Sequence, residues 1–180
     1  SARLPLAGGS TTCPTSAAHS KSGSGQVPGS TGHPGRRRDR LEGQAVKLNI
    51  LSDLHLSRGA LARPENSADV TILAGDVARP QEAACWAMDI GKPVLYVLGN
   101  HEFYGGSISE TADELKRLCV GSNVHVLNND EIFVRGVRFL GTTLWTDFML
   151  FGEGERRAAA IDEAIRLLHD FRKIRDDRAP

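Results

Sequence analysis

Residues 94–102 read Val94-Leu95-Tyr96-Val97-Leu98-Gly99-Asn100-His101-Glu102, an apolar run that ends in glycine and then in polar side chains. Two stretches upstream are built in a similar way, Leu48 to His55 (LNILSDLH) and Val70 to Asp76 (VTILAGD). Short apolar or β-branched runs that end at glycine and polar residues are typical of buried strands. The three stretches therefore predict neighbouring strands of one largely parallel sheet, and with it an α/β fold.

The segments around these strands predict helices and further strands. Residues 80–90 begin with proline and end at Gly91, which is typical of a helix. A second helix is expected from Thr111 to Cys119, because Thr111 and Glu114 have the spacing of a capping box. Residues 124–127 predict another strand, and residues 132–140 predict a hairpin that turns at Arg135-Gly136.

The last long segment, residues 155–175, carries apolar residues at helical spacing and charges at the positions between them. This pattern predicts one amphipathic helix whose apolar stripe packs into the core: Ile161, Ile165, Leu168, Phe171 and Ile174.

The first 45 residues differ in composition from the rest of the 180-residue chain. They hold six Lys/Arg and two Asp/Glu, a net charge of +4, whereas residues 46–180 hold 16 and 20, a net charge of −4. All ten aromatic residues follow residue 45, and 23 of the first 45 residues are Gly, Pro, Ser or Thr. Such a segment buries too little apolar surface to offset its ordering entropy. We therefore expect a disordered basic leader over residues 1–45 and one folded domain over residues 46–180.

Composition also argues against several classes of protein. The longest apolar run, residues 83–88, has six residues, whereas a membrane helix needs about 20. The basic cluster at residues 36–40 has no interleaved aromatic residue, so nucleic-acid binding is not indicated. Three widely separated cysteines without a CxxC pair support neither a disulfide framework nor a thiolate zinc site. No signal-peptide pattern is visible at the start, and a cytoplasmic protein is expected.

The polar residues behind the three strands indicate a metal site. The carboxyl ends of parallel strands meet at one edge of a sheet, where α/β proteins place their ligands. Asp53 and His55 are two residues apart, so an extended segment points both to the same side. Bringing Asp53 close to Asp76 sets two negative charges against each other, and a divalent cation removes that repulsion. Mixed Asp, His and Asn ligands suit Mn, Fe, Zn or Ni, whereas the imidazole argues against a purely Mg or Ca site.

The order of these motifs resembles that of the calcineurin-like metallophosphoesterase family. The resemblance rests on Asp53-Leu54-His55, Gly75-Asp76 and Gly99-Asn100-His101-Glu102, and it extends from about Val46 to Trp145. It implies an αββα sandwich with two divalent metal ions, at which metal-activated water hydrolyses a phosphoester substrate.

The resemblance also implies a role for each motif residue. The metal ligands are Asp53 and His55 for the first ion, Asp76 as the bridge between both ions, and Asn100 for the second ion. His101 acts as the general acid or stabilises the phosphoryl group, and Glu102 orients its ring. The motifs do not identify the residues that bind the substrate. Arg58 and Arg79, just beyond the first two strands, could contact phosphate, but an ordinary surface arginine is the commoner explanation.

The sequence departs from the family after His101. The family pattern continues with a strand that ends in His and with a Gly-His-x-His block, and neither occurs here. His125 lies inside a Val-His-Val strand and His169 on the amphipathic helix, so both are explained without metal. The domain is therefore expected to be incomplete on its C-terminal side.

This departure leaves an alternative function open. The chain is then a non-catalytic fragment, or one that needs a complementing C-terminal chain. A Rossmann-like nucleotide binder is a third reading, disfavoured because no Gly-x-Gly-x-x-Gly follows the first strand.

Overall fold

The computed structural model describes residues 45–59 and 61–176, which all belong to one unit of the chain, residues 44–180. The leader expected over residues 1–45 lies outside the described residues, except for its last position. Among the described residues, no helix combines the length and the apolar character that crossing a membrane requires.

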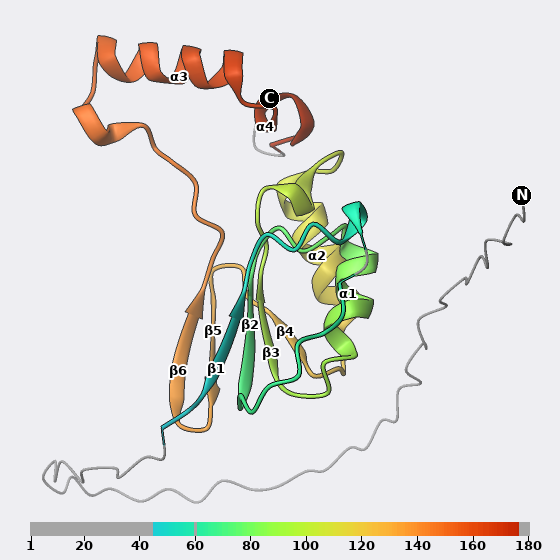
Figure 1. The fold of residues 1–180 in the computed structure, drawn as a ribbon. Coiled ribbons are helices and arrows are strands. Elements are labelled where there is room, and N and C mark those ends of the chain that lie inside the picture. Colours follow the sequence, from blue (N-terminus) through green and yellow to red (C-terminus); the bar gives the residue numbers. More distant parts are fainter. Residues whose placement is uncertain (1–44, 60, 177–180) are drawn as a thin grey trace, which may run out of the picture. The chain divides into compact units, whose positions relative to one another are not determined.

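Four parallel strands form the central sheet, in the order β1-β2-β3-β4 (Figure 1). They are β1 (Leu48–Leu51), β2 (Val70–Ala74), β3 (Val94–Val97) and β4 (Val124–Val126). Leu51 pairs with Leu73, and Ala74 pairs with Val97, so β1, β2 and β3 end at the same edge of the sheet. The predicted α/β fold with a parallel sheet is confirmed, and the three motif-bearing strands are neighbours.

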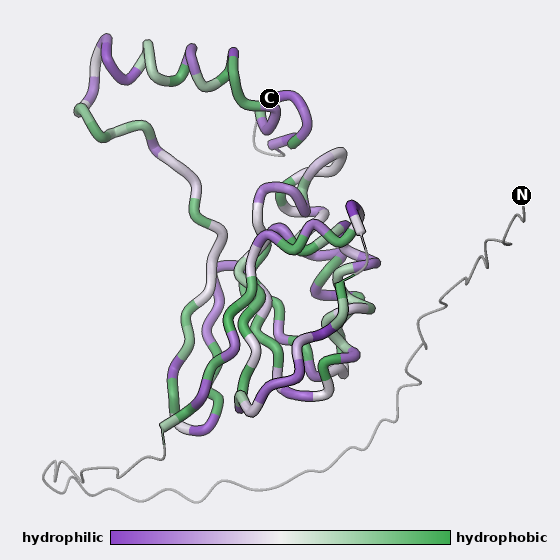
Figure 2. Tube along the Cα trace, in the orientation of Figure 1, coloured by the Kyte–Doolittle hydropathy of each residue, from purple (hydrophilic) through white to green (hydrophobic). Residues whose placement is uncertain are grey.

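The sheet is covered on both faces. The helices α1 (Pro80–Met88) and α2 (Ile108–Cys119) pack against one face, around Leu73 and Tyr96. A hairpin of β5 (Asp130–Val134) and β6 (Val137–Gly141) packs against the other, around a small cluster of Val70, Leu95 and Leu127. Figure 2 shows the corresponding hydrophobic character of the central strands. Burial on both faces explains why β2 and β3 are nearly continuous apolar runs, whereas β1 leaves Leu48 and Ile50 exposed.

Helix α2 begins three residues earlier than predicted. Ser107 is the N-cap: its Oγ accepts a hydrogen bond from the Glu110 backbone N–H at 3.3 Å and donates one to the Glu110 carboxylate at 3.0 Å. The capping box is therefore Ser107–Glu110, and the prediction of Thr111–Glu114 was wrong. Both pairs have the required spacing, but Thr111 is buried inside the helix.

The C-terminal segment is two helices, α3 (Glu155–Leu167) and α4 (Asp170–Lys173), instead of the single helix predicted. Leu168, with φ −87° and ψ 131°, has an extended backbone and ends α3. The prediction that the apolar stripe packs into the core was also wrong, because α3 buries no residue and Phe171 is 48% exposed. Of the stripe, Ile174 packs against the core.

The break between the two helices directs the chain back to the loop that follows β3. The Gly105 N–H donates to the Lys173 carbonyl at 2.7 Å, and the Arg175 N–H donates to the Gly106 carbonyl at 3.0 Å. The Ile108 N–H donates to the Arg175 carbonyl at 3.1 Å. These bonds hold α4 beside the short 3-10 helix η2 (His101–Phe103), which carries the third sequence motif.

Candidate metal centre

The loops that follow β1 and β2 stay paired beyond the ends of the strands. The Asp53 N–H donates to the Gly75 carbonyl at 3.1 Å, and the His55 N–H donates to the Asp76 carbonyl at 3.0 Å. The next N–H, of Leu56 at the start of the 3-10 helix η1 (Leu56–Arg58), donates to the Val77 carbonyl at 2.9 Å. The backbone itself therefore sets Asp53, His55 and Asp76 side by side.

Three residues of these loops adopt an unfavourable backbone conformation. Asp53, His55 and Asp76 have φ values of 55°, 43° and 56°, and only three other described non-glycine residues have positive φ. Left-handed conformations are costly for residues with a Cβ, and they cluster at functional sites because the surrounding structure holds them there. The strain marks the same three positions that the sequence motifs single out.

Two glycines allow the loops behind β2 and β3 to touch. A Cβ at Gly75, where φ is 90°, would lie 2.7 Å from the backbone N of Gly99. A Cβ at Gly99 would lie 2.6 Å from the backbone N of Asp76 and would overlap the Asp76 carboxylate. Both positions therefore require glycine, and the glycine in each motif is explained by close backbone approach.

The carboxylate of Glu102 connects the loops that follow β2 and β3 through hydrogen bonds to their backbone. The side chain is 1% exposed. Its Oε2 accepts hydrogen bonds from the backbone N–H of Asp76 (3.0 Å) and of Gly99 (2.8 Å). Its Oε1 accepts from the backbone N–H of Val77 (2.6 Å) and from the Tyr96 hydroxyl (2.9 Å). Burial, followed by the charge of Glu102, raises the pKa of Tyr96, so this hydroxyl remains a donor.

These contacts differ from the role expected for Glu102. The resemblance implied that its carboxylate orients the His101 ring, but both oxygens are engaged by backbone amides and by Tyr96. The structural reason is that the Glu102 side chain is buried between the loops that follow β2 and β3. Glu102 is therefore placed to fix the backbone that carries Asp76.

Three side chains converge at the edge of the sheet. One donor atom each of His55, Asp76 and His101 lies within 4.8 Å of the other two, and all three residues are half-buried. His101 Nε2 is 4.0 Å from Asp76 Oδ2, and the ring of His101 meets that of His55 edge to face at a centroid distance of 4.7 Å. Two imidazoles and a carboxylate are the donor set that Zn, Mn or Fe prefer, so these residues fit a divalent metal ion.

The other expected ligands lie around this cluster. Asp53 is at its open side: the side chain is 70% exposed, and its Oδ1 is 4.0 Å from His55 Nε2. The Asn100 amide nitrogen donates to Asp170 Oδ1 at 2.9 Å. The structure thus joins His101, expected as a catalytic residue, to His55 and Asp76, and it sets Asn100 against a residue of α4.

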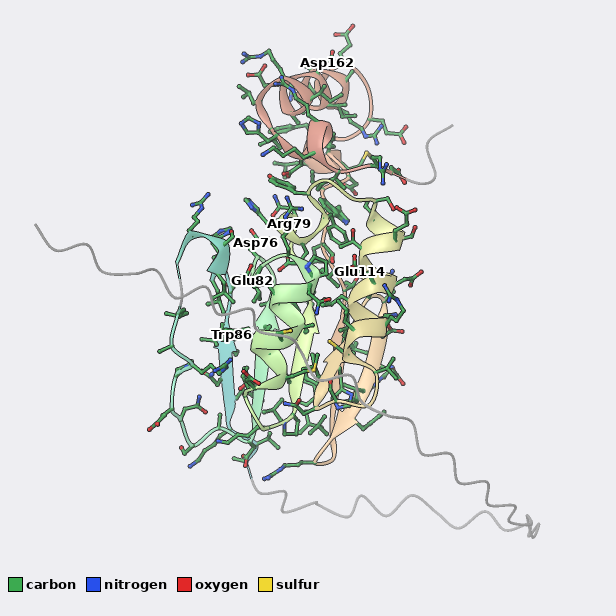
Figure 3. All side chains as sticks on the ribbon, turned by 90° about the vertical axis from the view of Figure 1, so that its right-hand side faces the viewer. Asp76, Arg79, Glu82, Trp86, Glu114 and Asp162 are labelled. Atoms are coloured by element: carbon green, nitrogen blue, oxygen red, sulfur yellow. The ribbon has the colours of Figure 1, made fainter. Side chains whose placement is uncertain are left out.

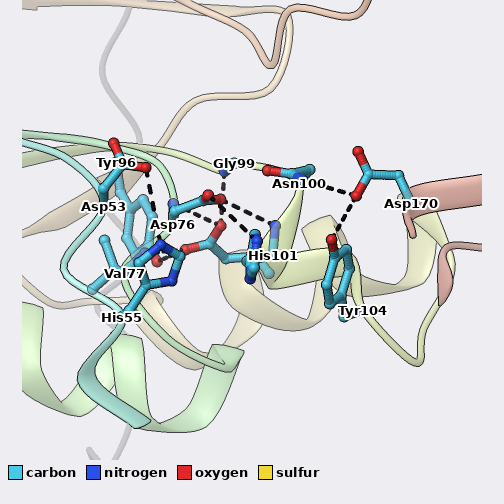
Figure 4. A network of polar contacts seen from close by, with 11 residues as sticks. Asp53, His55, Asp76, Val77, Tyr96, Gly99, Asn100, His101, Tyr104 and Asp170 are labelled. Carbon is cyan, nitrogen blue, oxygen red and sulfur yellow. Dashed lines mark hydrogen bonds and ion pairs between the residues drawn. The ribbon is translucent and has the colours of Figure 1, made fainter. Parts of the chain in front are cut away.

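Tyr104 and Asp170 form a support for His101 that the sequence did not reveal. The Tyr104 ring stacks on the His101 ring at a centroid distance of 4.4 Å and an angle of 27°. Its hydroxyl donates to Asp170 Oδ1 at 2.6 Å, the same oxygen that binds Asn100 (Figure 4). Partial burial, then the hydrogen bond to Asp170, raise the pKa of Tyr104 to about 12. One carboxylate oxygen of α4 therefore binds two residues beside the candidate metal centre, Asn100 and Tyr104.

The remaining histidines in the described part of the chain stay outside the centre. His125 on β4 and His169 before α4 are both exposed, and neither belongs to the cluster of possible metal ligands.

Two cavities meet at Asp76. The larger, of about 770 Å³, is a groove lined by Asp53, Asp76 and Asn100 and by the segment from Leu140 to Thr146. The smaller, of about 240 Å³, is lined by His55, His101 and Tyr104 and by three cationic side chains. The candidate centre therefore lies between a wide groove and a small pocket.

Comparison with known proteins identifies the family. Residues 46–176 match the calcineurin-like phosphoesterase family, and the chain belongs to that family. The resemblance seen in the sequence is thereby confirmed, and the family is one of phosphoesterase enzymes. An uncharacterized protein of Acanthamoeba polyphaga mimivirus is 26% identical over 155 residues, which cover 73% of this chain and 54% of the relative. The chain thus spans about half the length of this curated relative.

Proposed function

We propose that the chain hydrolyses phosphoesters with the help of divalent metal ions. The observation that supports this most is the cluster of His55, Asp76 and His101 at the carboxyl edge of a phosphoesterase fold. In this proposal Asp53, His55 and Asp76 hold a first ion, and Asp76 and Asn100 contribute to a second, with Mn, Fe, Zn or Ni as the metal. Bound metal ions at such a site activate water and clamp the phosphate.

The surroundings of His101 suit a proton donor to the leaving oxygen. Its backbone N–H donates to Asp76 Oδ1 at 3.0 Å, and its ring is stacked on Tyr104. About a third of the side chain is exposed, so a substrate can reach it. An imidazole exchanges protons near neutral pH, and contacts of the ring with Tyr104 and His55 limit its reorientation before the transfer.

The proposal is tested on the purified full chain with p-nitrophenyl phosphate and bis(p-nitrophenyl) phosphate. We expect hydrolysis that requires added Mn or Fe and that stops when a chelator removes the metal. Metal binding is measured separately by calorimetry. A folded chain that binds neither Mn nor Fe, nor any of the other candidate ions, would contradict the proposal.

A second candidate function is that of a fragment that needs a complementing chain. It is favoured by solvent-exposed apolar side chains on the side of the sheet that the hairpin covers. Ile50 on β1 is 63% exposed, and Leu140 on β6 is 71% exposed. Within the described residues these side chains remain mostly uncovered, and an exposed apolar sheet edge or face favours pairing with another chain.

Complementation has a direct test. A polypeptide that carries a strand ending in His and a Gly-His-x-His block is added to the purified chain. Under this candidate, hydrolysis rises at least about tenfold as the second ion gains its ligands. A monodisperse monomer that already binds two metal ions tightly excludes the candidate.

We further propose that the protein works in a reducing compartment such as the cytoplasm. Neither Cys85 nor Cys119, the two cysteines in the described part of the chain, forms a disulfide bond, and Cys119 is buried. Cysteines that do not form disulfide bonds are common in proteins that remain in a reducing environment.

A further inference from the structure

The smaller cavity beside the metal cluster is strongly cationic. Besides His55, His101 and Tyr104, its walls include the side chains of Arg58, Arg79 and Lys173. The one carboxylate in the lining is Asp76, which also faces the metal cluster. Counting the histidines as neutral, three positive charges thus oppose one negative charge in a space of about 240 Å³.

Three separate elements bring these cations together. Arg58 is the last residue of η1, Arg79 is the N-cap of α1, and Lys173 is the last residue of α4. Figure 3 shows Arg79 close to Asp76, at the end of α1 remote from Trp86. The Lys173 ammonium lies 4.8 Å from the centre of the Tyr104 ring, and a Cβ at Gly105 would lie 3.7 Å from Arg79 Nη1.

None of the three cations has a carboxylate partner among the described residues. Elsewhere in the described part of the chain, six Lys and Arg side chains form ion pairs with Asp or Glu, among them Arg63 with Asp89 and Lys116 with Asp130. Unpaired cations that converge on one cavity repel each other. An anion in the pocket removes this repulsion and accepts the guanidinium hydrogen bonds.

The size and position of the pocket indicate which kind of anion it can bind. Cavities for organic ligands commonly measure about 300–1,000 Å³, and this pocket is smaller, at about 240 Å³. It shares His55, Asp76 and His101 with the candidate metal cluster, so a group inside it lies next to the reacting phosphate.

We propose that this pocket binds a second phosphate group of the substrate, and that the enzyme acts on substrates with two linked phosphates in preference to simple monoesters. The inference rests on the proposed function, because it assigns the reacting phosphate to the metal cluster. Arg58 and Arg79 donate hydrogen bonds to the second phosphate from their planar guanidinium groups, and Lys173 adds a positive charge.

The first part of the test needs no metal. Calorimetry measures the binding of inorganic phosphate to the metal-stripped full chain. We expect Arg79→Gln and Arg58→Gln each to weaken this binding at least about tenfold, while Arg117→Gln, an exposed position on α2, leaves it unchanged. Thermal unfolding verifies that each variant remains folded. Unaltered phosphate binding in both pocket variants would overturn the proposal.

The second part uses the Mn-loaded chain with inorganic phosphate and inorganic pyrophosphate. We expect pyrophosphate to bind at least about tenfold more tightly than phosphate, and Arg79→Gln to remove most of that difference. Because pyrophosphate also chelates Mn, Arg117→Gln serves as the matched reference. Equal affinities for the two anions would mean that the pocket and the cluster hold one phosphate, and would overturn the proposal. Failure of the proposed function shows up separately, as absent Mn binding and absent hydrolysis.

Discussion

Replacing Glu102 by glutamine is expected to lower the free energy of unfolding by about 2–4 kcal/mol. The carboxylate accepts four hydrogen bonds in a buried position, two at each oxygen. Glutamine offers one acceptor oxygen, and its amide nitrogen must then face a donor. If that nitrogen points to Val77 and Tyr96, the Tyr96 hydroxyl can turn and accept, but the Val77 N–H is left without a partner. The remaining bonds also lose the strengthening that an ionised acceptor gives.

The same substitution should loosen the metal centre, because Glu102 holds the backbone of Asp76 and Gly99. Residues that orient metal ligands typically change metal affinity by about 10–100-fold, and we expect a loss in this range for Mn. Urea unfolding gives the stability, and calorimetry gives the affinity. Glu114→Gln, an exposed glutamate on α2 (Figure 3), is the matched control and should alter neither quantity. Unchanged stability of the Glu102→Gln chain would show that the carboxylate does not hold the loops.

The role of Glu102 shows how far sequence reasoning reaches in this protein. Each motif follows a strand whose apolar character is plain from the sequence, and parallel pairing of β1, β2 and β3 is enough to bring Asp53, Asp76 and Asn100 to one edge. The direction of the Glu102 side chain depends instead on which backbone amides the neighbouring loops leave unpaired. That is a property of three loops in contact, and no single motif encodes it.

The C-terminal segment shows a second limit of prediction from the sequence. Its apolar spacing continues through the break at Leu168 and His169, so periodicity alone predicts one helix. Because the chain turns at this break, Asp170 reaches Asn100 and Tyr104 across more than 60 residues of sequence. Nothing in the local pattern around Asp170 distinguishes it from the other charges of an amphipathic helix. Lys173 of the cationic pocket was missed for the same reason.

Arg58 and Arg79 illustrate a different difficulty. From the sequence, both arginines could contact phosphate, but an ordinary surface position is the commoner explanation, and both are indeed exposed. Exposure does not separate the two explanations. What separates them is the missing carboxylate partner and the shared cavity, and both observations need the three-dimensional arrangement of η1, α1 and α4.

Replacing Asp76 by asparagine is expected to lower metal affinity and metal-dependent hydrolysis by at least about 100-fold, more than the typical loss from a residue that only orients a ligand. Asp76 is the one carboxylate of the three-residue cluster, and its side chain is 14% exposed. An amide at this position binds a divalent ion far less well, because it carries no charge to offset that of the cation. In the proposed site Asp76 is the ligand shared by both ions, and neither the imidazole of His55 nor the amide of Asn100 can replace its charge.

The fold should tolerate this substitution, and the loss is therefore attributable to the metal centre. Asparagine retains one oxygen, which can accept the His101 backbone N–H as Asp76 Oδ1 does. It is also among the residues that best tolerate a positive φ, here 56°. We expect the unfolding midpoint to stay within a few degrees of the unmodified chain. Asp113→Asn, at an exposed position on α2, controls for the loss of one negative charge. If the Asp76→Asn chain bound Mn as well as the unmodified chain does, the ion would have to be held elsewhere, and the assignment of the cluster as the metal centre would be wrong.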